Sequence, residues 1–408
     1  MKFWITLSTL IILILGFTLS SCNAQNSYEP DPVLLISIDG LMNEYIDRNE
    51  TPNFDRLIGD GTWAEFLEPV FPTKTFPTHH SMSTGLYVEN HGIIANSFYA
   101  LDHGKRFSYG APDDEEDERW WGGEPIWITA ENQGLTTTTF FWPGSEACYD
   151  GVRPTRWLEY DGSIPDKARV DSVANWFDPQ GDVRTNFSTL YFSDVDSQGH
   201  SHGPNSEEVD KAVEEVDETL GYMIDRLNEV GVWPDINIII VSDHGMAELS
   251  DDKIIVLDEI IDMDDVNMID WNPVAMMQPE EGRSEAIYEQ LKEHEENYSV
   301  YYRDDMPDRY RFRDHERIPE IIMIADVPYT IVTRDRYEER GIIAGQHGYD
   351  HQAPEMHAFL LARGPDFREG ERGEVVNMVD LYELMADLLG IEPSPNDGDP
   401  DATQHMRR

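Results

Sequence analysis

VLLISIDG, residues 33–40, is the stretch that decides the fold class we expect for this chain. Six consecutive residues, five of them apolar, are followed by an acid and a glycine. An apolar run of this kind is typical of a strand that is buried on both faces, as the strands of a parallel sheet are. The stretch therefore predicts a central strand that ends at Asp39.

The same pattern returns further along the chain, in LYFSDVD at residues 190–196 and in INIIIVSDHG at residues 236–245. Apolar residues at helical spacing occur at 51–61, 206–231 and 378–389. Strands that alternate with helices predict an α/β fold, in which helices cover both faces of a mostly parallel sheet. In such folds, ligands bind at the carboxyl ends of the strands.

The first 21 residues have the composition of a signal peptide: a basic start, an apolar run from Ile5 to Leu19, and then small residues. The run is short for a membrane span and no basic residues follow it, so a signal peptide is favoured over a transmembrane anchor. The sequence before Cys22 resembles a bacterial lipoprotein box. We therefore expect lipid on Cys22 and a tether at residues 22–32, which would hold an exported protein on a membrane facing the periplasm or the cell exterior.

Residues 33–390 are expected to form one main domain. From 263 to 326 the composition shifts to one amphipathic helix and short alternating strands, which predicts an inserted cap subdomain. After residue 390 the density of proline, aspartate and glycine predicts an acidic flexible tail at 391–408.

The charge balance limits the partners of this chain. Its 408 residues include 80 acidic and 30 basic side chains, for a net charge of −50. Such a surface repels nucleic-acid polymers, and it suits high ionic strength, where salt screens self-repulsion. The chain contains two cysteines, Cys22 and Cys148, so no disulfide framework is expected.

Acids at the ends of the three predicted strands, together with nearby or downstream histidines, form the candidate chemical site. The six residues are Asp39, Asp196, Asp243, His200, His244 and His347. Taken singly, a strand-end aspartate often caps a helix. Taken together, three carboxylates and three imidazoles can form two zinc sites of three ligands each, with positions left for substrate. Two metals of this kind promote displacement at phosphorus.

A threonine-rich segment at residues 71–97 offers a nucleophile. A hydroxyl becomes a good nucleophile when a metal lowers its pKa. Thr75 precedes a stretch, 78–84, that can form a helix, and a helix N-terminus favours an anionic phosphoryl group. The local sequence alone does not separate Thr75 from Thr73 or Thr78.

Seven segments of the chain together resemble the nucleotide pyrophosphatase/phosphodiesterase family of the alkaline phosphatase superfamily. In chain order they are ISIDGL (36–41), PTKTFPTHHSMSTGLYVENHGIIANS (72–97), WPGSE (142–146), DSQGHSHGP (196–204), VSDHGM (241–246), RIPEIIMIADVPYTI (317–331) and GQHGYDHQAPEMHAFLLARGPDF (345–367). The resemblance implies an alkaline phosphatase-like fold, with a mostly parallel central sheet, flanking helices and a small cap.

The same resemblance implies two zinc ions and assigns roles to individual residues. One zinc would be held by Asp39, Thr75, Asp243 and His244, and the other by Asp196, His200 and His347. Thr75 would be the nucleophile, and Asn96 with the Thr75 backbone N–H would hold a phosphoryl oxygen. Phe76 and Tyr191 match positions that hold a nucleoside base or another substrate group, with core packing as their alternative. Supporting or structural roles are expected for His79, His80, His91 and His202.

The expected activity is hydrolysis of small-molecule phosphodiesters or nucleotide pyrophosphate bonds through a phosphothreonyl intermediate on Thr75, releasing a phosphomonoester such as a nucleoside monophosphate. A monoester dianion usually needs an arginine or lysine, and Lys74, the basic residue next to Thr75, is expected to point away. A phosphomonoesterase on the same scaffold and a non-catalytic metal- or ligand-binding surface lipoprotein are the alternatives. Nucleoside triphosphates, dinucleotides, nucleotide sugars and phospholipid head groups all stay open as substrates.

Overall fold

The structure, a computed structural model, describes residues 30–408. The expected signal peptide and the lipidation site Cys22 lie outside the described residues. Within residues 30–408, no helix combines the length and the apolar character needed to cross a membrane.

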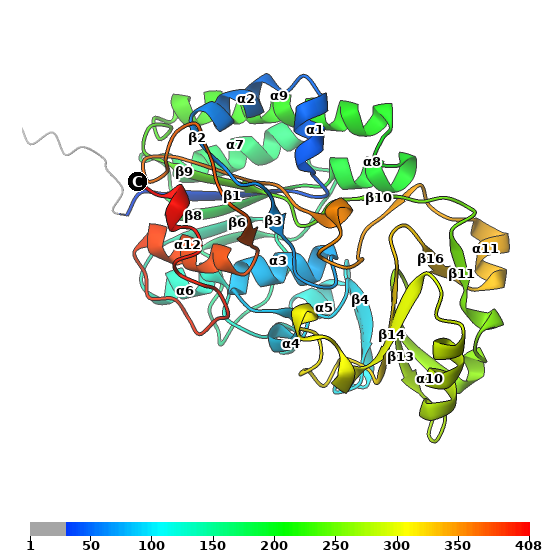
Figure 1. Cartoon of the computed structure of the whole chain (residues 1–408). Helices are drawn as coiled ribbons and strands as arrows, with labels where there is room; N and C mark the ends of the chain where they lie inside the picture. The colour runs from blue at the N-terminus through cyan, green and yellow to red at the C-terminus, as the bar shows by residue number, and fades with distance from the viewer. Residues whose placement is uncertain (1–29) are drawn as a thin grey trace, which may run out of the picture.

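A mostly parallel sheet of eight strands forms the centre of the molecule (Figure 1). Its middle strands are β9 (Asn237–Val241), β1 (Val33–Ile38) and β8 (Phe187–Phe192), with β1 parallel to both neighbours. On the β8 side follow β6 (Thr137–Phe140) and β7 (Arg156–Leu158), and on the β9 side β18 (Leu360–Arg363), β2 (Gly61–Trp63) and β19 (Glu371–Arg372). Strand β18 runs antiparallel to its two neighbours.

Two apolar layers cover the sheet, one on each face. Successive residues of β1 alternate between them: Leu34 and Ile36 pack in one layer, and Val33 and Leu35 in the other. Figure 1 shows helices α2, α7 and α9 over one face and α3, α6 and α12 over the other. These helices are α2 (Pro52–Gly59), α7 (Asp166–Phe177), α9 (Glu207–Glu229), α3 (Thr75–Thr84), α6 (Ile126–Asn132) and α12 (Asp380–Leu389). The predicted α/β fold is confirmed.

Helix α9 illustrates how a capping residue and apolar residues at helical spacing form one of these helices. The Ser206 side chain accepts a hydrogen bond from the Val209 N–H and so caps the helix. Residues such as Val213 and Leu220 then recur at helical spacing and are fully buried against the sheet.

Residues 263–326 contain a second, smaller sheet. Its strands β12 (Val266–Asp270), β13 (Val274–Pro279), β15 (Ile321–Ala325) and β14 (Tyr298–Tyr302) are antiparallel, and α10 (Ser284–Glu293) packs with them. Strands β11 (Ile254–Val256) and β16 (Thr330–Val332) pair in parallel where the chain leaves and re-enters the main domain. Figure 1 shows this cap beside the main sheet, and β12 lies against β4 (Ser97–Ala100).

Short elements complete the described chain. They are α1 (Asn43–Arg48), β3 (Leu67–Glu68), α4 (Val88–His91), β5 (Lys105–Ser108), α5 (Pro112–Glu115), α8 (Asp194–His202), β10 (Ala247–Glu248), α11 (Arg334–Arg340), β17 (Gly345–Gln346) and β20 (Val376–Asn377).

The prediction of a flexible tail at 391–408 is wrong. The Asp397 N–H donates to the Gly85 carbonyl at 2.8 Å, and the Asp399 N–H to the Asp380 carboxylate at 2.8 Å. The Met406 side chain is fully buried in the main core. Composition suggested disorder, but these long-range contacts give the segment enough partners to be ordered.

Candidate active site

The three strand-end aspartates meet at one edge of the sheet because their strands are neighbours. Asp39 directly follows β1, Asp196 lies in the first turn of α8 after β8, and Asp243 follows β9. The Asp196 N–H donates to the Asp39 carbonyl at 3.1 Å, and the Gly40 N–H to Asp243 Oδ1 at 3.1 Å. Gly40 has a φ of +71°, and a Cβ there would lie 3.1 Å from the Asp196 Cα, so this close approach requires glycine.

Four of the predicted residues form a first group. His244 Nε2 lies 3.4 Å from Asp39 Oδ1 and 3.0 Å from Asp243 Oδ2. The Thr75 hydroxyl oxygen lies 3.4 Å from the same nitrogen. The structure thus brings together the residues for which one shared zinc was expected.

The remaining three predicted ligands form a second group beside it. His200, one helical turn after Asp196, places Nε2 3.4 Å from Asp196 Oδ1 and 3.2 Å from His347 Nε2. His347 Nε2 is 3.7 Å from Asp196 Oδ1. The His347 ring stacks on His244 with centroids 3.4 Å apart, so the two groups adjoin. Ligand atoms of Asp196, His244 and His347 also lie within 4.8 Å of one another.

Hydrogen bonds fix the three candidate ligand histidines in one orientation. Their Nδ1 atoms each contact a backbone carbonyl at 2.8–2.9 Å, those of Gly345 for His200, Gly245 for His244 and Thr73 for His347. A carbonyl accepts only from a protonated nitrogen, so a neutral ring held in this way would present the lone pair of its Nε2 atom to the site. This arrangement is typical of metal-binding histidines.

Electrostatics in the site favour a bound cation. In the described part of the chain, Asp39 Oδ1, Asp196 Oδ1 and Asp243 Oδ2 are buried without a hydrogen-bond partner. Burial, with the charges of Asp243 and Asp196, holds the pKa of Asp39 well above its usual value. Burial, with His244 and His200 nearby, holds the pKa of His347 well below its usual value. Unpaired buried carboxylates and neutral imidazoles are a donor set that fits zinc.

Thr75 is the first residue of α3. It therefore lies at a helix N-terminus, as we expected from the sequence. The hydroxyls of the two rival threonines are engaged elsewhere: Thr73 with the Tyr349 carbonyl at 3.2 Å, and Thr78 with the Lys74 carbonyl at 2.7 Å. Of these three threonines, Thr75 is the one that faces the metal-binding candidates.

Asn96 lies next to the nucleophile segment. Its side-chain Oδ1 accepts a hydrogen bond from the Phe76 N–H at 2.9 Å. This contact fixes the amide group beside the first turn of α3, where a phosphoryl group would bind.

The two aromatic residues expected at the substrate site, Phe76 and Tyr191, lie in different surroundings. The Tyr191 hydroxyl donates to Asp39 Oδ2 at 2.5 Å, so Tyr191 contacts a metal-binding candidate directly. Phe76 is half-buried, with Trp121 and Tyr109 rings 6.1 and 6.0 Å away. Tyr160, whose ring is 6.1 Å from Tyr191, is 48% exposed, and Tyr109 is 61% exposed. Neither Tyr109 nor Tyr160 could be predicted from the sequence, because no local motif marks an exposed aromatic ring.

Three of the four other histidines are buried and hydrogen-bonded. His79 bridges the Ser37 hydroxyl and the Thr75 carbonyl, each at 2.8 Å. His80 donates to the Gly122 carbonyl, and His91 contacts the Ser81 hydroxyl. Exposed His202 lies 3.9 Å from Glu208.

Lys74, the cation next to the nucleophile, is paired within the protein. Its ammonium group contacts the Asp270 carboxylate of cap strand β12, and the side chain is almost fully buried. Arg169, which lies beneath Tyr191, donates to the Tyr191 carbonyl at 2.8 Å. Both cations are therefore engaged near the site.

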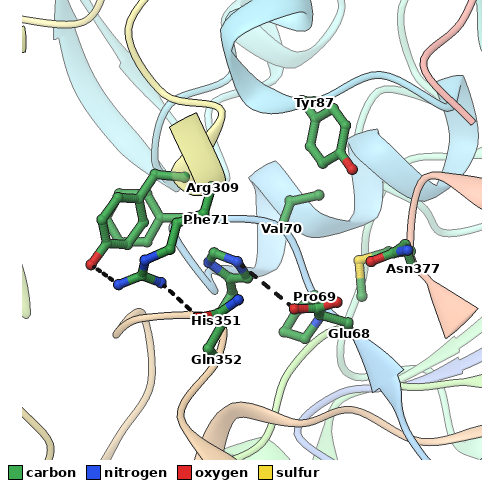
Figure 2. A pocket seen from close by; sticks show the side chains of 11 residues that line it. Glu68, Pro69, Val70, Phe71, Tyr87, Arg309, His351, Gln352 and Asn377 are labelled. Carbon is green, nitrogen blue, oxygen red and sulfur yellow. Dashed lines mark hydrogen bonds and ion pairs between the residues drawn. The ribbon is translucent and has the colours of Figure 1, made fainter. Parts of the chain in front are cut away.

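A separate cavity of about 150 Å³ is lined in part by Phe71 and Tyr87 of the segment that contains Thr75 (Figure 2). Glu68, Phe71, Arg309 and His351 are among its lining residues, and His351 Nε2 is 3.9 Å from the Glu68 carboxylate. Within the described residues, its walls include none of the metal-binding candidates. This cavity is therefore distinct from the group of metal-binding candidates at the edge of the main sheet.

Comparisons with known proteins show the family of this chain. The family model described as type I phosphodiesterase / nucleotide pyrophosphatase matches residues 33–350. Human bis(5'-adenosyl)-triphosphatase ENPP4 is 35% identical over 391 residues, which cover 95% of this chain and 84% of that protein. Human ectonucleotide pyrophosphatase/phosphodiesterase family member 5 is 34% identical over 390 residues, which cover 95% of this chain and 81% of that protein.

Solved structures show the same fold. Murine ectonucleotide pyrophosphatase / phosphodiesterase 5 superposes with a TM-score of 0.88 at 33% identity, covering 92% of this chain and all of that one. A second structure of that murine protein, an inactive Thr→Ala variant in complex with AMP, also has a TM-score of 0.88. The chain therefore belongs to the type I phosphodiesterase / nucleotide pyrophosphatase family of hydrolytic enzymes, within the alkaline phosphatase superfamily.

Proposed function

We propose that this chain is a two-zinc phosphodiesterase and nucleotide pyrophosphatase that works through a phosphothreonyl ester on Thr75 and releases a phosphomonoester such as a nucleoside monophosphate. The observation that carries the proposal is the 3.4 Å approach of the Thr75 hydroxyl to His244 Nε2, among buried carboxylate oxygens. The AMP complex of the inactive Thr→Ala murine variant supports it.

The seven residues of the two groups would hold the metal ions. Asp39, Thr75, Asp243 and His244 would bind one zinc, and Asp196, His200 and His347 the other. When bound, the two ions would lower the pKa of the hydroxyl and stabilise negative charge on oxygen.

The chain's own residues define the course of the reaction. The Thr75 oxygen attacks phosphorus and forms the ester, while the bond to the departing oxygen breaks on the opposite side and the Thr75 hydroxyl proton passes through solvent to that oxygen. The departing side would face the group of Asp196, His200 and His347. Water then attacks from the same side and breaks the bond between phosphorus and the Thr75 oxygen; one water proton restores the Thr75 hydroxyl, and the other leaves the phosphomonoester for the buffer.

Asn96 and the Thr75 backbone N–H would hold a phosphoryl oxygen as charge develops there. For the organic part of the substrate, Phe76, which follows Thr75, and the exposed ring of Tyr109, 6.0 Å from the Phe76 ring, would offer ring surface. The exposed ring of Tyr160 lies 6.1 Å from the Tyr191 ring. Tyr191 would act on the substrate indirectly, because its hydroxyl is engaged with Asp39.

Diesters are favoured over monoesters because the nearby cation is already paired. Lys74 contacts Asp270, so its charge is balanced before a substrate binds. A phosphate diester carries one charge less than a monoester dianion and does not need that extra cation.

Zinc-loaded wild-type protein and Thr75→Ala protein test the proposal on a nucleotide diester. We expect the alanine variant to lose about 10³-fold or more in kcat while keeping both metals, because a covalent nucleophile has no substitute. Thr78→Ala is the matched control. If the turnover of Thr75→Ala stays within tenfold of wild type, Thr75 is not the nucleophile. If the metal-loaded wild-type protein shows no turnover, the alternative of a non-catalytic binding protein is favoured.

The lipid anchor is a separate proposal that rests on the sequence around Cys22. Export with lipidation predicts that the full chain fractionates with membranes and incorporates a labelled fatty acid. Cys22→Ser should abolish both, and Cys148→Ser should change neither. Incorporation of label into Cys22→Ser would contradict it.

A further inference from the structure

The cavity of about 150 Å³ in Figure 2, here called the cap cavity, lies between the main domain and the cap. Glu68, the last residue of β3, and Phe71 line it from the main domain, and Arg309 and Tyr310 line it from the cap. His351, in the loop after β17, also lines it. A cavity of about this volume holds a molecule the size of benzene, so the cap cavity has room for a small organic ligand.

The Glu68 carboxylate has no partner of full opposite charge. Among the residues that the structure describes, its side chain makes no hydrogen bond, and its ion-pair contact is with His351 Nε2 at 3.9 Å, the dashed line in Figure 2. Burial, with the charge of Asp350 next, raises the pKa of Glu68, and no cation opposes this shift. The carboxylate therefore lacks a donor and a counter-charge.

His351 is also without a hydrogen bond. The residue is 7% exposed, and its Nδ1 atom is buried with no hydrogen-bond partner in the described part of the chain. Burial lowers the pKa of His351 to about 4, so the ring is neutral near neutral pH and does not balance the charge of Glu68. A neutral ring can present the lone pair of Nε2 toward Glu68.

The arginines of the cap that lie near the cavity are paired with other acids. Arg309 donates to both oxygens of Asp350, at 2.6 and 2.5 Å. Arg311, which lies over the ring of a lining tyrosine, is paired with Glu89 at 3.1 Å. The charge of Glu68 is thus left uncompensated at the cap cavity.

The spacing of two acceptor atoms fits one ammonium nitrogen. Glu68 Oε1 and His351 Nε2 are 3.9 Å apart. A nitrogen atom about 2.8 Å from each of them can donate one N–H to each, with about 90° between the two bonds. A water molecule can donate in the same way but leaves the negative charge unbalanced. A zinc ion takes three or four protein ligands, and Asp350 is already engaged with Arg309.

Much of the remaining wall is apolar and aromatic. Val70, Phe71 and Met378 line the cap cavity, and the Phe71 ring lies 4.6 Å from the ring of Tyr310. Apolar side chains favour the carbon atoms of a ligand, and aromatic rings attract organic cations. The wall therefore suits an alkylammonium ion better than a hydrated inorganic ion.

We propose that the cap cavity binds a small organic ammonium ion, with its nitrogen held by Glu68 and His351 and its carbon atoms against Val70, Phe71 and Met378. The inference goes beyond the proposed function and does not rest on it, because the walls that the structure describes contain none of the seven metal-binding candidates.

Three substitutions separate the charge from the shape of the site. Glu68→Gln keeps the size of the side chain and removes its charge. Glu65→Gln, at an exposed position outside the cavity wall, makes the same change and is the matched control. His351→Phe keeps an aromatic ring and removes the acceptor nitrogen.

The experiment titrates propylammonium chloride into the zinc-loaded full chain near neutral pH and measures Kd by calorimetry. NaCl keeps the ionic strength constant, so screening of the net charge of −50 does not change during the titration. We expect a Kd of about 1 mM for wild type. Glu68→Gln should bind at least about tenfold more weakly, His351→Phe several-fold more weakly, and Glu65→Gln as tightly as wild type.

A comparison of ligands on the wild type does not depend on the folding of any variant. Tetramethylammonium carries the charge but has no N–H, and n-propanol has a similar shape to propylammonium but no charge. Each should bind at least about tenfold more weakly than propylammonium.

Equal affinity of wild type and Glu68→Gln for propylammonium would overturn the inference, because the ion would then bind elsewhere on the acidic protein. No binding to wild type would overturn it as well, as would equal affinity for n-propanol or for tetramethylammonium. None of these results depends on turnover, so this inference and the proposed function can fail separately.

Discussion

The Tyr191 hydroxyl donates a 2.5 Å hydrogen bond to Oδ2 of Asp39, while Oδ1 of the same carboxylate faces His244 Nε2 at 3.4 Å. One oxygen is thus held by a neutral donor, and the other is left for a metal ion. Burial, with the charge of Asp39 next, raises the pKa of Tyr191 well above its usual value, so the hydroxyl keeps its proton.

Tyr191→Phe should therefore weaken zinc binding. Loss of a hydrogen bond that orients a metal ligand typically costs 10- to 100-fold in metal affinity or activity. Competition with a chromophoric chelator measures the affinity, and Tyr160→Phe is the control, because its hydroxyl contacts Ser193 at 3.4 Å instead of a metal-binding candidate. Equal zinc affinity in the wild type and Tyr191→Phe would contradict this role.

Removal of the metals should destabilise the fold. Without cations, Asp39 Oδ1, Asp196 Oδ1 and Asp243 Oδ2 are buried without a hydrogen-bond partner, and burial, with the charges of Asp243 and Asp196, raises the pKa of Asp39. Each zinc present at a thousand times its Kd adds about 4 kcal/mol to the unfolding free energy. Calorimetry should show a lower Tm in a strong chelator and recovery on adding Zn²⁺. An unchanged Tm would count against a metal site here.

Asp270→Asn tests the basis of diester preference. The substitution leaves the Lys74 charge unbalanced next to Thr75, so hydrolysis of p-nitrophenyl phosphate should rise several-fold relative to bis(p-nitrophenyl) phosphate. Asp264→Asn, an exposed change in the same cap, should leave the ratio unchanged. If Asp270→Asn also leaves the ratio of monoester to diester hydrolysis unchanged, the pairing of Lys74 with Asp270 does not set the preference for diesters.

Acid should destabilise the protein through its buried histidines. Burial lowers the pKa of His80 to about 4. Between pH 6.5 and 4 the unfolded chain binds a proton there that the folded chain does not, so stability falls as the pH falls. From pH 7 to 5 the loss from His80 is about 2 kcal/mol.

Urea unfolding of wild type and His80→Gln at both pH values measures this loss. Glutamine can still donate to the Gly122 carbonyl but does not titrate, so the variant should lose about 2 kcal/mol less than wild type between pH 7 and 5. His294→Gln, at an exposed position, is the control and should behave as wild type. Identical losses in wild type and His80→Gln would show that His80 does not cause the effect.

The sequence predicted the parts of the site that depend on strand patterning. Continuous apolar runs predicted β1, β8 and β9, and Asp39, Asp196 and Asp243 follow these runs in the sequence. The three aspartates meet in space because neighbouring parallel strands end at the same edge of the sheet. The pairing of Thr75 with this edge came from the family resemblance, since no local rule separates three threonines in one segment.

Contacts between distant segments were beyond the sequence. The Tyr191–Asp39 hydrogen bond and the Lys74–Asp270 contact each join residues that no periodicity relates. The ordered C-terminal segment was missed for the same reason, because composition records what a segment is made of and not what packs against it.

The parallel pairing of β11 with β16 brings the two connections of the cap side by side. A segment that leaves and returns at adjacent points can be exchanged for one of different length without shifting the register of the main sheet. Grafting caps from relatives onto this scaffold would replace Asp270, and with it the partner of Lys74, while β1, β8 and β9 stay intact. With the role proposed for Asp270, such a graft would change the preference for diesters and leave the strands that precede Asp39, Asp196 and Asp243 in place.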